Sequence, residues 1–436
     1  MTRSDSVHLV ADARRVITKP FLPREEIYPD GSSRMQLVLR RVRAMSDSDI
    51  AQTLADARRQ FEHRHRDLTS VLERNFRFVA ERLGHLELLA EHLSADHRQL
   101  IGAYFTHEYS IEAAALSNPS IVTAPDQSDL GPGEIRFVMS LRAIGEGHLS
   151  SIEFRSGVVA ADATVRLDPT SRFATTGDHA PGDQVGLAHS AASDYRTSFP
   201  PSIDISERVL FPSSPTESHG MEDARFVRFV DDDGEVTYFA TYTAFDGRQI
   251  LPQLLETTDF TEFRVTTLTG PAAHNKGMAI FPRRIGGSFV ALGRHDNVNN
   301  FVLTSPDIRV WSEATMIQEP SRPWELMQLG NCGSPLETEA GWLVITHGVG
   351  PFRRYTLGAL LLDLDDPSHV IGHLKEPLLS PADAERDGYV PNVVYSCGSL
   401  IHAGHLILPY GYADVGAGIA TIALDELLSR LTSSAR

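Results

Sequence analysis

The chain is poor in cysteine, and this limits the kinds of fold and site that it can have. Its 436 residues include two cysteines, Cys332 and Cys397. Two thiols cannot make a disulfide framework, and they do not supply a thiolate metal site. We therefore expect both to be small buried residues in a core held together by apolar packing.

Long apolar runs and a surplus of basic charge are also missing. No apolar run reaches the roughly 18 residues of a membrane span, and the N-terminal sequence MTRSDSVHLVADARRV has no apolar signal core. We expect a cytoplasmic protein. Lys and Arg number 40 against 57 Asp and Glu, a formal net charge of −17. Such a surface repels phosphate backbones and anionic lipid, so neither nucleic acid nor a membrane is an expected partner.

Several familiar catalytic motifs are absent. The sequence contains no Gly-rich phosphate loop, no HExxH, no GxSxG and no CxxC. Nucleotide-dependent, zinc-protease and serine-hydrolase chemistry therefore have little support. Hydrophobic residues nevertheless make up 42% of the chain, which is enough for a sizeable core in two domains or in one large repeat architecture.

The N-terminal quarter has the periodicity of helices. Apolar residues at steps of three and four, or their multiples, predict helix over residues 47–93, with an interruption at Gly84 and a separate helix over 86–93. A further helix is expected over 95–116. We assign residues 1–110 to a helical extension that could also form a homo-oligomer contact. Its apolar stripe consists of Ile50, Leu54, Ala57, Phe61, Leu68, Leu72, Phe76, Val79 and Leu83.

After Asn118-Pro119 the pattern becomes that of many short antiparallel strands. Runs such as TYFATYTAF, SFVALGR and GWLVITHGV are apolar or alternating and are bounded by Gly, Pro, Asp and Asn. LLETTDFTEF (254–263) and FVLTSPDIRVW (301–311) form a weak internal repeat. Such recurrence predicts a mainly β fold for residues 111–436, a five-bladed β-propeller with these three runs as inner strands. A pair of β-sandwiches is the alternative.

In a propeller the inner strands converge on a central channel, so polar residues near their ends would share one site. One group of these is carboxylic and another is cationic. In a protein of this net charge, cations gathered in one channel would mark an anion pocket. The collected residues are Arg142, Glu222, Asp223, Arg225, Asp246, Arg248, His274, Lys276, Arg294, His347, Tyr355, Asn392, Tyr395 and Asp414.

Each of these residues also has an ordinary structural interpretation. Glu222 and Asp223 could be a carboxylate pair in a turn, and Asp246-Gly247 reads first as a hairpin turn. His347, inside an apolar strand, could be a core histidine with its hydrogen bonds satisfied, and Lys276 could be a loop lysine.

Four ordered blocks resemble glycoside hydrolase family 130. GMEDARF followed by TYFATYTAFDG is similar to the family's Glu-Asp-Pro-Arg segment and its Thr-Tyr-Thr-Ala-Tyr-Asp-Gly segment. HNKGMAIFP resembles its Lys-x-x-x-x-Phe-Pro loop. The third block is GWLVITHGVGPFRRYTLGALLLDLDDP and the fourth is VPNVVYSCGSLIHAGHLILPYGYAD. The resemblance extends from about residue 115 to the end and leaves the N-terminal helices outside it.

The resemblance implies a five-bladed propeller and an inverting β-mannoside phosphorylase; a minority of the family are β-1,2-mannosidases. Asp223 would be the general acid, with Arg142, Arg248, Lys276 and His347 contacting phosphate. The expected substrate contacts are Glu222, Asp246, Arg294, Tyr355, Asn392 and Asp414. No metal and no cofactor is expected, with inorganic phosphate as co-substrate. The partner would be a β-linked manno-oligosaccharide or a mannosyl disaccharide.

The chemistry accounts for this residue set. Inverting cleavage needs an acid on the leaving oxygen and a nucleophile on the opposite face of the sugar. Phosphate is already anionic, so it needs cations to hold it rather than a base. Asp223 should be protonated at neutral pH, with a pKa raised by burial or by Glu222. The family's proline is Ala224 here, which loosens the turn expected to aim Asp223. A hydrolase of the same family and a non-catalytic carbohydrate-binding propeller are the alternatives.

Overall fold

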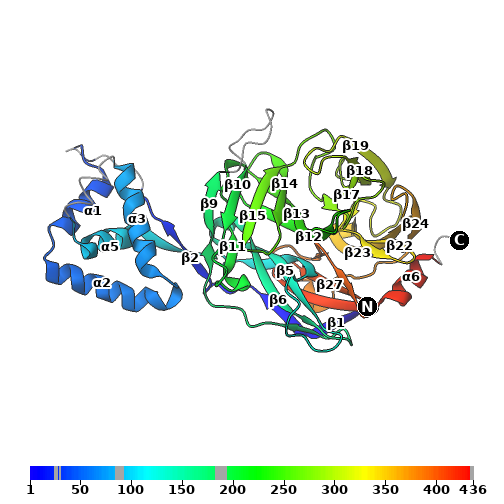
Figure 1. The fold of residues 1–436 in the computed structure, drawn as a ribbon, viewed down its shortest axis with the longest axis horizontal. Helices are drawn as coiled ribbons and strands as arrows, with labels where there is room; N and C mark the ends of the chain where they lie inside the picture. The colour runs from blue at the N-terminus through cyan, green and yellow to red at the C-terminus, as the bar shows by residue number, and fades with distance from the viewer. Residues whose placement is uncertain (24–27, 29–30, 84–92, 182–193, 433–436) are drawn as a thin grey trace. The chain divides into compact units, whose positions relative to one another are not determined.

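The computed structural model describes residues 1–23, 28, 31–83, 93–181 and 194–432. They form two compact units, each described by itself below (Figure 1). The β unit consists of Met1–Asp12, Glu112–Ser171 and Thr175–Arg436, and the helical unit consists of Ala13–Ile111 and Arg172–Ala174. In the described part of the chain, no helix has both the length and the apolar character needed to cross a bilayer.

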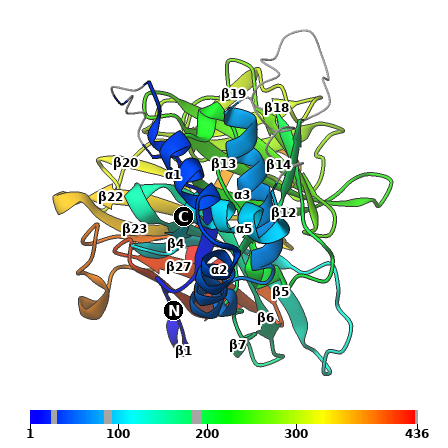
Figure 2. The same ribbon diagram turned by 90° about the vertical axis from the view of Figure 1, so that its left-hand side faces the viewer.

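The helical unit packs its helices around an apolar core (Figure 2). Its elements are β2 (Val16–Pro20), α1 (Arg34–Arg43), α2 (Asp47–Phe61), α3 (Leu68–Arg82), α5 (Ala95–Tyr104) and β3 (Thr106–Ser110). Three residues of the predicted stripe are buried in this core, Ile50 on α2 and Phe76 and Val79 on one face of α3. Phe61, from the same stripe, remains 40% exposed. Homo-oligomerisation through these helices stays a prediction.

The single helix predicted from residue 47 is interrupted. A 3-10 turn, Glu62–Arg64, follows α2, and α3 starts afresh behind Asp67, whose carboxylate accepts the Ser70 N–H at 3.0 Å. Asp is a favoured N-cap because its side chain satisfies a helix N–H that has no partner within the helix. The helix predicted over 86–93 falls almost wholly on residues 84–92, outside the described residues.

The helix predicted over 95–116 ends much earlier than expected. Helix α5 stops at Tyr104, and THEYS (106–110) becomes strand β3, which pairs with β2 in the register Tyr109↔Ile17. The backbone of this segment therefore finds its partners in a neighbouring strand instead of in a continued helix. The residues that follow enter the first sheet of the β unit.

Five antiparallel-rich sheets of four to six strands make up the described β unit. The first sheet holds β4 (Ala115–Thr123), β5 (Ile135–Ile144), β6 (Ser150–Val159), β7 (Val165–Leu167), β8 (Thr175–Thr176) and β11 (Arg208–Leu210). The second holds β9 (Asp178–Pro181), β10 (Tyr195–Ser198), β12 (Met221–Val230), β13 (Val236–Phe245), β14 (Ile250–Thr257) and β15 (Glu262–Thr267).

The other three sheets follow in chain order. The third holds β16 (Ala279–Ile280), β17 (Phe289–Gly293), β18 (Asn300–Ser305) and β19 (Glu313–Gln318). The fourth holds β20 (Gln328–Asn331), β21 (Leu336–Thr338), β22 (Gly341–Gly350), β23 (Arg354–Leu362) and β24 (Val370–His373). The fifth holds β25 (Val394–Tyr395), β26 (Leu400–His402), β27 (His405–Tyr412), β28 (Gly416–Ala423) and the N-terminal β1 (Thr2–Val10), with helix α6 (Leu424–Thr432) after β28.

The two segments of the predicted repeat occupy equivalent positions. LLETTDFTEF runs from β14 into β15, and FVLTSPDIRVW covers β18 and the turn before β19. The runs predicted as inner strands are instead β13, β17 and β22, each the second strand of its sheet, with neighbours on both edges. That position explains their apolar sequence, because side chains of a central strand are covered on both faces.

The first strands of the sheets are joined directly to one another. Ser120 of β4 accepts the Phe226 N–H of β12, and the Cys397 N–H beside β25 reaches the Pro119 carbonyl of β4. Between the third and fourth sheets, the Asn331 amide donates to the Gly277 carbonyl at 2.8 Å. These strands consequently bring residues that are distant in sequence into one polar cluster.

The N-terminal residues belong to the β unit. The predicted division fell between residues 110 and 111, and the main change of unit is at Ile111/Glu112, but Met1–Asp12 lie in the fifth sheet. Strand β1 pairs there with β28, in a register that includes Thr2↔Thr421. Val7 is 2% exposed and contributes to a core with Ile407 and Ile419.

Truncating Val7 should therefore weaken the β unit. We expect Val7→Ala to lower the free energy of unfolding by about 1.5–3 kcal/mol, because two buried carbons are lost and a cavity remains. Val10→Ala is a matched control, since Val10 is on the same strand and is 55% exposed; its effect should stay within about 0.5 kcal/mol. Urea unfolding of both variants measures the difference, and equal effects would contradict the pairing of β1 with β28.

Candidate active site

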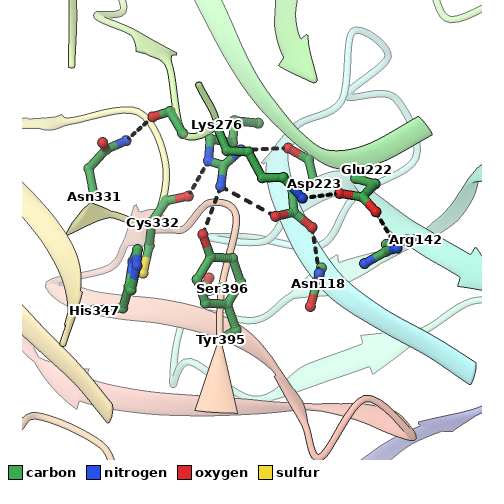
Figure 3. Close-up of polar contacts among 12 residues, drawn as sticks. Asn118, Arg142, Glu222, Asp223, Lys276, Asn331, Cys332, His347, Tyr395 and Ser396 are labelled. Atoms are coloured by element: carbon green, nitrogen blue, oxygen red, sulfur yellow. Dashed lines mark hydrogen bonds and ion pairs between the residues drawn. The ribbon is translucent and has the colours of Figure 1, made fainter. Parts of the chain in front are cut away.

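The candidate site lies where the first strands of the β unit begin, and Figure 3 draws its polar contacts. Asp223 and Glu222 come from β12, Asn118 from β4 and Arg142 from β5. Lys276 comes from the loop before β16. The sequence-predicted Glu222, Asp223, Arg142 and Lys276 are thus brought together, as the convergence argument expected.

Asp223 occupies a bulge inside β12. Glu222 pairs with Thr243 and Arg225 pairs with Thr241, so two residues of β12 oppose one residue of β13. The backbone of Asp223 has φ +56°, in the left-handed region that Asp and Asn tolerate better than most residues. A bulge re-aims one side chain and is common beside functional sites. The prediction of a turn here was wrong, because the extra residue is accommodated within the strand.

Two neighbours hold the carboxylate of Asp223. The Asn118 amide, from β4, donates to Oδ1 at 2.5 Å (Figure 3). The Arg225 guanidinium is 3.7 Å from Oδ2 and also donates to the Asp223 carbonyl at 2.8 Å. Both the side chain and the backbone of Asp223 are therefore fixed.

Arg225 connects this bulge to two other sheets. Its Nε donates to the Cys332 carbonyl at 3.0 Å, and one Nη donates to the Tyr395 hydroxyl at 2.8 Å. Its side chain is 1% exposed, and a fully hydrogen-bonded guanidinium in such a place is costly to disturb. These contacts supply the rigidity that the change from proline to Ala224 had put in doubt.

Glu222 is occupied on both oxygens. Arg142 donates to Oε1 at 2.8 Å, and Lys276 forms a short ion pair with Oε2 (Figure 3). These three side chains are 13%, 18% and 33% exposed, respectively. Two cations thus lie beside Asp223 and share one carboxylate while still being reachable from solvent.

A further cation, Arg294, lies beside His347 of β22, together with two tyrosine rings. The Arg294 guanidinium donates to Nε2 of His347 at 3.2 Å. The rings of Tyr355 and Tyr395 pack against the imidazole, with centroids 6.0 Å and 4.9 Å away. His347 is 1% exposed. Burial and the nearby Arg294 and Arg225 lower its pKa well below the usual value, so it is neutral at physiological pH.

The charge state of Asp223 differs from the expectation. Burial raises its pKa, but the cations of Arg225, Arg142 and Lys276, together with the Asn118 hydrogen bond, outweigh burial and bring it below the ordinary value. The prediction of a raised pKa was wrong, because it counted burial and the neighbouring Glu222 and not the cations of Arg225, Arg142 and Lys276.

Asp414 has the opposite tendency. It lies in the turn between β27 and β28 with φ +49°. Burial raises its pKa, and the nearby carboxylates of Asp223 and Glu222 add to this, while Arg142 and Arg353 oppose it. Asp414 therefore holds a proton more readily than Asp223 does.

Three predicted residues are not brought into these contacts. Asp246 lies in the β13–β14 turn, where its carboxylate accepts the N–H groups of Arg248 and Gln249. The ordinary interpretation as a hairpin turn therefore describes Asp246, and Arg248 is exposed on the same turn. Asn392 accepts a hydrogen bond from Arg386 at 3.0 Å, and its carbonyl accepts the Tyr355 N–H.

Sequence reasoning did not assign a role to Asn118 or Asn331. Asn118 adopts φ +51° in a register shift of β4, and Asn331 bridges to Gly277. The sequence signal for Asn118 is the Asn-Pro pair, which lies inside β4 and which in the sequence marks only the change in pattern. Cys332 and Cys397 are buried, free thiols, as predicted.

Because the folded state keeps His347 neutral, this residue should make stability depend on pH. Below about pH 6.5 the unfolded chain protonates this imidazole and the folded chain does not, so the free energy of unfolding falls as pH drops. We expect His347→Gln to reduce the loss of melting temperature between about pH 7.5 and about pH 5.5. His369→Gln, at an exposed position, serves as the control; an unchanged pH dependence in both variants would contradict the neutral buried imidazole.

Comparisons with known proteins agree with the blocks identified in the sequence. Residues 202–433 match the family described as β-1,4-mannooligosaccharide phosphorylase, glycoside hydrolase family 130. A 1,2-β-oligomannan phosphorylase of Thermoanaerobacter sp. (strain X514) is 34% identical over 231 residues, which are 51% of this chain and 75% of that protein. A β-1,4-mannooligosaccharide phosphorylase of Ruminococcus albus is 33% identical over 171 residues, 36% of this chain and 51% of that protein.

A solved structure extends the likeness to the fold. The β-1,2-mannobiose phosphorylase of Listeria innocua, in complex with β-1,2-mannobiose, superposes with a TM-score of 0.52 at 22% identity. The alignment covers 74% of this chain and 93% of that one. The family match spans more than half of the sequence and includes the four blocks identified in it. The chain therefore belongs to glycoside hydrolase family 130 and is an enzyme of the glycoside phosphorylase class.

Proposed function

We propose that the chain catalyses the reversible, inverting phosphorolysis of a β-mannoside to mannose 1-phosphate and the released sugar. Inorganic phosphate is the co-substrate, and no other cofactor takes part. The relatives named above are phosphorylases of β-linked mannosides. The observation that carries the proposal is the pairing of Glu222 with both Arg142 and Lys276 directly beside Asp223.

In this proposal Asp223 is the general acid. An inverting glycosidase needs a carboxylic acid on the leaving oxygen and a nucleophile on the other face of the sugar. Asp223 is held by Asn118 and Arg225, which gives the acid the fixed aim that proton transfer requires. The bulge in β12 turns it toward the space that Arg142 and Lys276 share.

Arg142, Lys276 and Arg294 would hold the phosphate. An attacking phosphate dianion needs donors that neutralise and orient it, and Arg and Lys are the usual choices. Neutral His347, hydrogen-bonded to Arg294, would fix the direction of that guanidinium. Tyr355 and Asp414 would line the sugar pocket together with Glu222, and the roles of Asp246, Arg248 and Asn392 remain predictions.

Hydrolysis is less well supported by the same contacts. A hydrolase would need a second carboxylate as base to activate water. Both oxygens of Glu222 are engaged by cations, so Glu222 is not placed to take a proton from water. A phosphate nucleophile needs no base, and the cations that a phosphate anion requires are present beside Asp223.

The five sheets would be the blades of a β-propeller. This proposal is supported by the direct contacts between the first strands of successive sheets. It also accounts for the equivalent positions of the two repeat segments in the second and third sheets. The candidate site would then open at one end of the central channel.

Phosphate dependence tests the reaction. With β-1,2- and β-1,4-linked manno-oligosaccharides as substrates, sugar release should require phosphate and should be matched by an equal amount of mannose 1-phosphate. In the reverse direction, mannose 1-phosphate and an acceptor sugar should release phosphate. Equal sugar release in phosphate-free buffer would overturn phosphorolysis and favour hydrolysis.

Replacing the acid should abolish most of the rate. We expect Asp223→Asn to lower kcat by roughly two to four orders of magnitude, because the shape is kept and the transferable proton is lost. Asp232→Asn makes the same change on an exposed turn at the other end of β12 and should keep its activity. Near-normal turnover by a folded Asp223→Asn variant would assign the acid to another residue.

A further inference from the structure

Asp223 faces a site that carries more positive than negative charge. Arg225 and Asn118 contact its carboxylate, and Arg142 and Lys276 lie beside it on Glu222. The remaining titratable groups that act on it are buried or weakly charged. They are Cys332 from the loop after β20, His347 from β22, Tyr395 and Cys397 from β25 and its loop, and Asp414 from the β27–β28 turn.

The charges of the side chains around Asp223 are therefore unbalanced. Arg225, Arg142 and Lys276 bring three positive charges, and Glu222 returns one negative charge. In this field the carboxylate form of Asp223 is favoured. A general acid, however, must carry a proton when the glycosidic bond breaks. A group that enters the site must therefore bring negative charge, so that the protonated form of Asp223 becomes favoured.

Phosphate can do this because it is an anion that binds to the same cations. Arg142 and Lys276 are held by Glu222, the residue next to Asp223 in the sequence. An anion on these two side chains would therefore lie close to the Asp223 carboxylate. Two anionic groups at short range in a partly desolvated site disfavour double ionisation, so one of them takes up a proton.

We propose that the site binds phosphate together with one proton and that this proton resides on Asp223. The monoanion H2PO4⁻ supplies both the phosphate and the proton. This inference rests on the proposed phosphorolysis and identifies the ionic form of its co-substrate. Binding of the co-substrate then protonates Asp223, and before phosphate binds Asp223 is a carboxylate that cannot donate a proton.

The steps balance in atoms and charge. H2PO4⁻ enters and passes one proton to the Asp223 carboxylate, which leaves HPO4²⁻ on the cations. An oxygen of HPO4²⁻ forms the new bond to C1 of the sugar while the bond from C1 to the leaving oxygen breaks. The proton of Asp223 ends on that leaving oxygen. Mannose 1-phosphate departs as the monoanion, and Asp223 is again a carboxylate.

Sulfate is the probe that isolates the proton, since it binds cationic sites as a dianion and does not titrate near neutral pH. In the wild-type protein, sulfate binding should take up a proton from solution. Its dissociation constant should rise by up to about tenfold per pH unit between about pH 5 and 7, as linkage to one proton requires. Calorimetry in buffers of different ionisation enthalpy measures the uptake directly.

Variants assign the proton to a residue. In Asp223→Asn the proton uptake should disappear, and sulfate should bind more tightly than to the wild type at about pH 7, because one repelling charge is gone. Asp232→Asn, on an exposed turn, should behave like the wild type. Lys276→Ala should weaken sulfate binding, and Lys375→Ala, at an exposed position, should not.

The outcomes separate this inference from the function on which it rests. Wild-type sulfate binding without proton uptake would overturn the inference, whatever the variants do. Full uptake retained by Asp223→Asn would also overturn it and would move the proton to Asp414. Loss of the proposed phosphorolysis would appear separately, as mannoside cleavage that does not need phosphate.

Discussion

The buried guanidinium of Arg225 is the constraint on which the site depends. It is bonded to the backbone of its own bulge, to the Cys332 carbonyl and to the Tyr395 hydroxyl. Three sheets are therefore fixed relative to one another at the point where Asp223 leaves β12. A charge this deeply buried is tolerated because its donors have partners, and the same partners keep the reactive carboxylate in one position. Structure and reactivity depend here on one side chain.

The membership of the site was largely predictable from sequence, but its charge state was not. Polar residues near strand ends identified Glu222, Asp223, Arg142 and Lys276, and the structure brings these together. Their protonation depends on which charges meet in space, and sequence spacing does not give that. The expectation for Asp223 failed because the cations of Arg225, Arg142 and Lys276 outweigh its burial, and two of these cations come from other elements. The exposed position of Arg248 depends on the geometry of one turn.

Among the helices and strands, too, some features follow from the local sequence and others depend on distant contacts. Apolar residues at steps of three and four predicted α2 and α3, because the spacing of these residues along the chain defines the buried face of each helix. The break between them depends on the cap formed by Asp67. The end of α5 depends on a pairing with β2, which lies far away in the chain. Apolar character singled out β13, β17 and β22 because they are covered on both sides. The first strands carry the site, and their mixed sequence made them harder to recognise.

The pairing of β1 with β28 has a consequence for how the molecule is made. Strand β1 pairs with a strand that is distant in the sequence, Thr2 with Thr421, and residues 13–111 of the helical unit lie between β1 and β4. The fifth sheet therefore cannot be completed until β28 has been synthesised, and contacts of such sequence separation form slowly. Until then β1 is an unpaired strand edge, the kind of surface that recruits other chains. The helices α1, α2, α3 and α5 lie within residues 34–104, so they can pack on one another while β1 still lacks its partner.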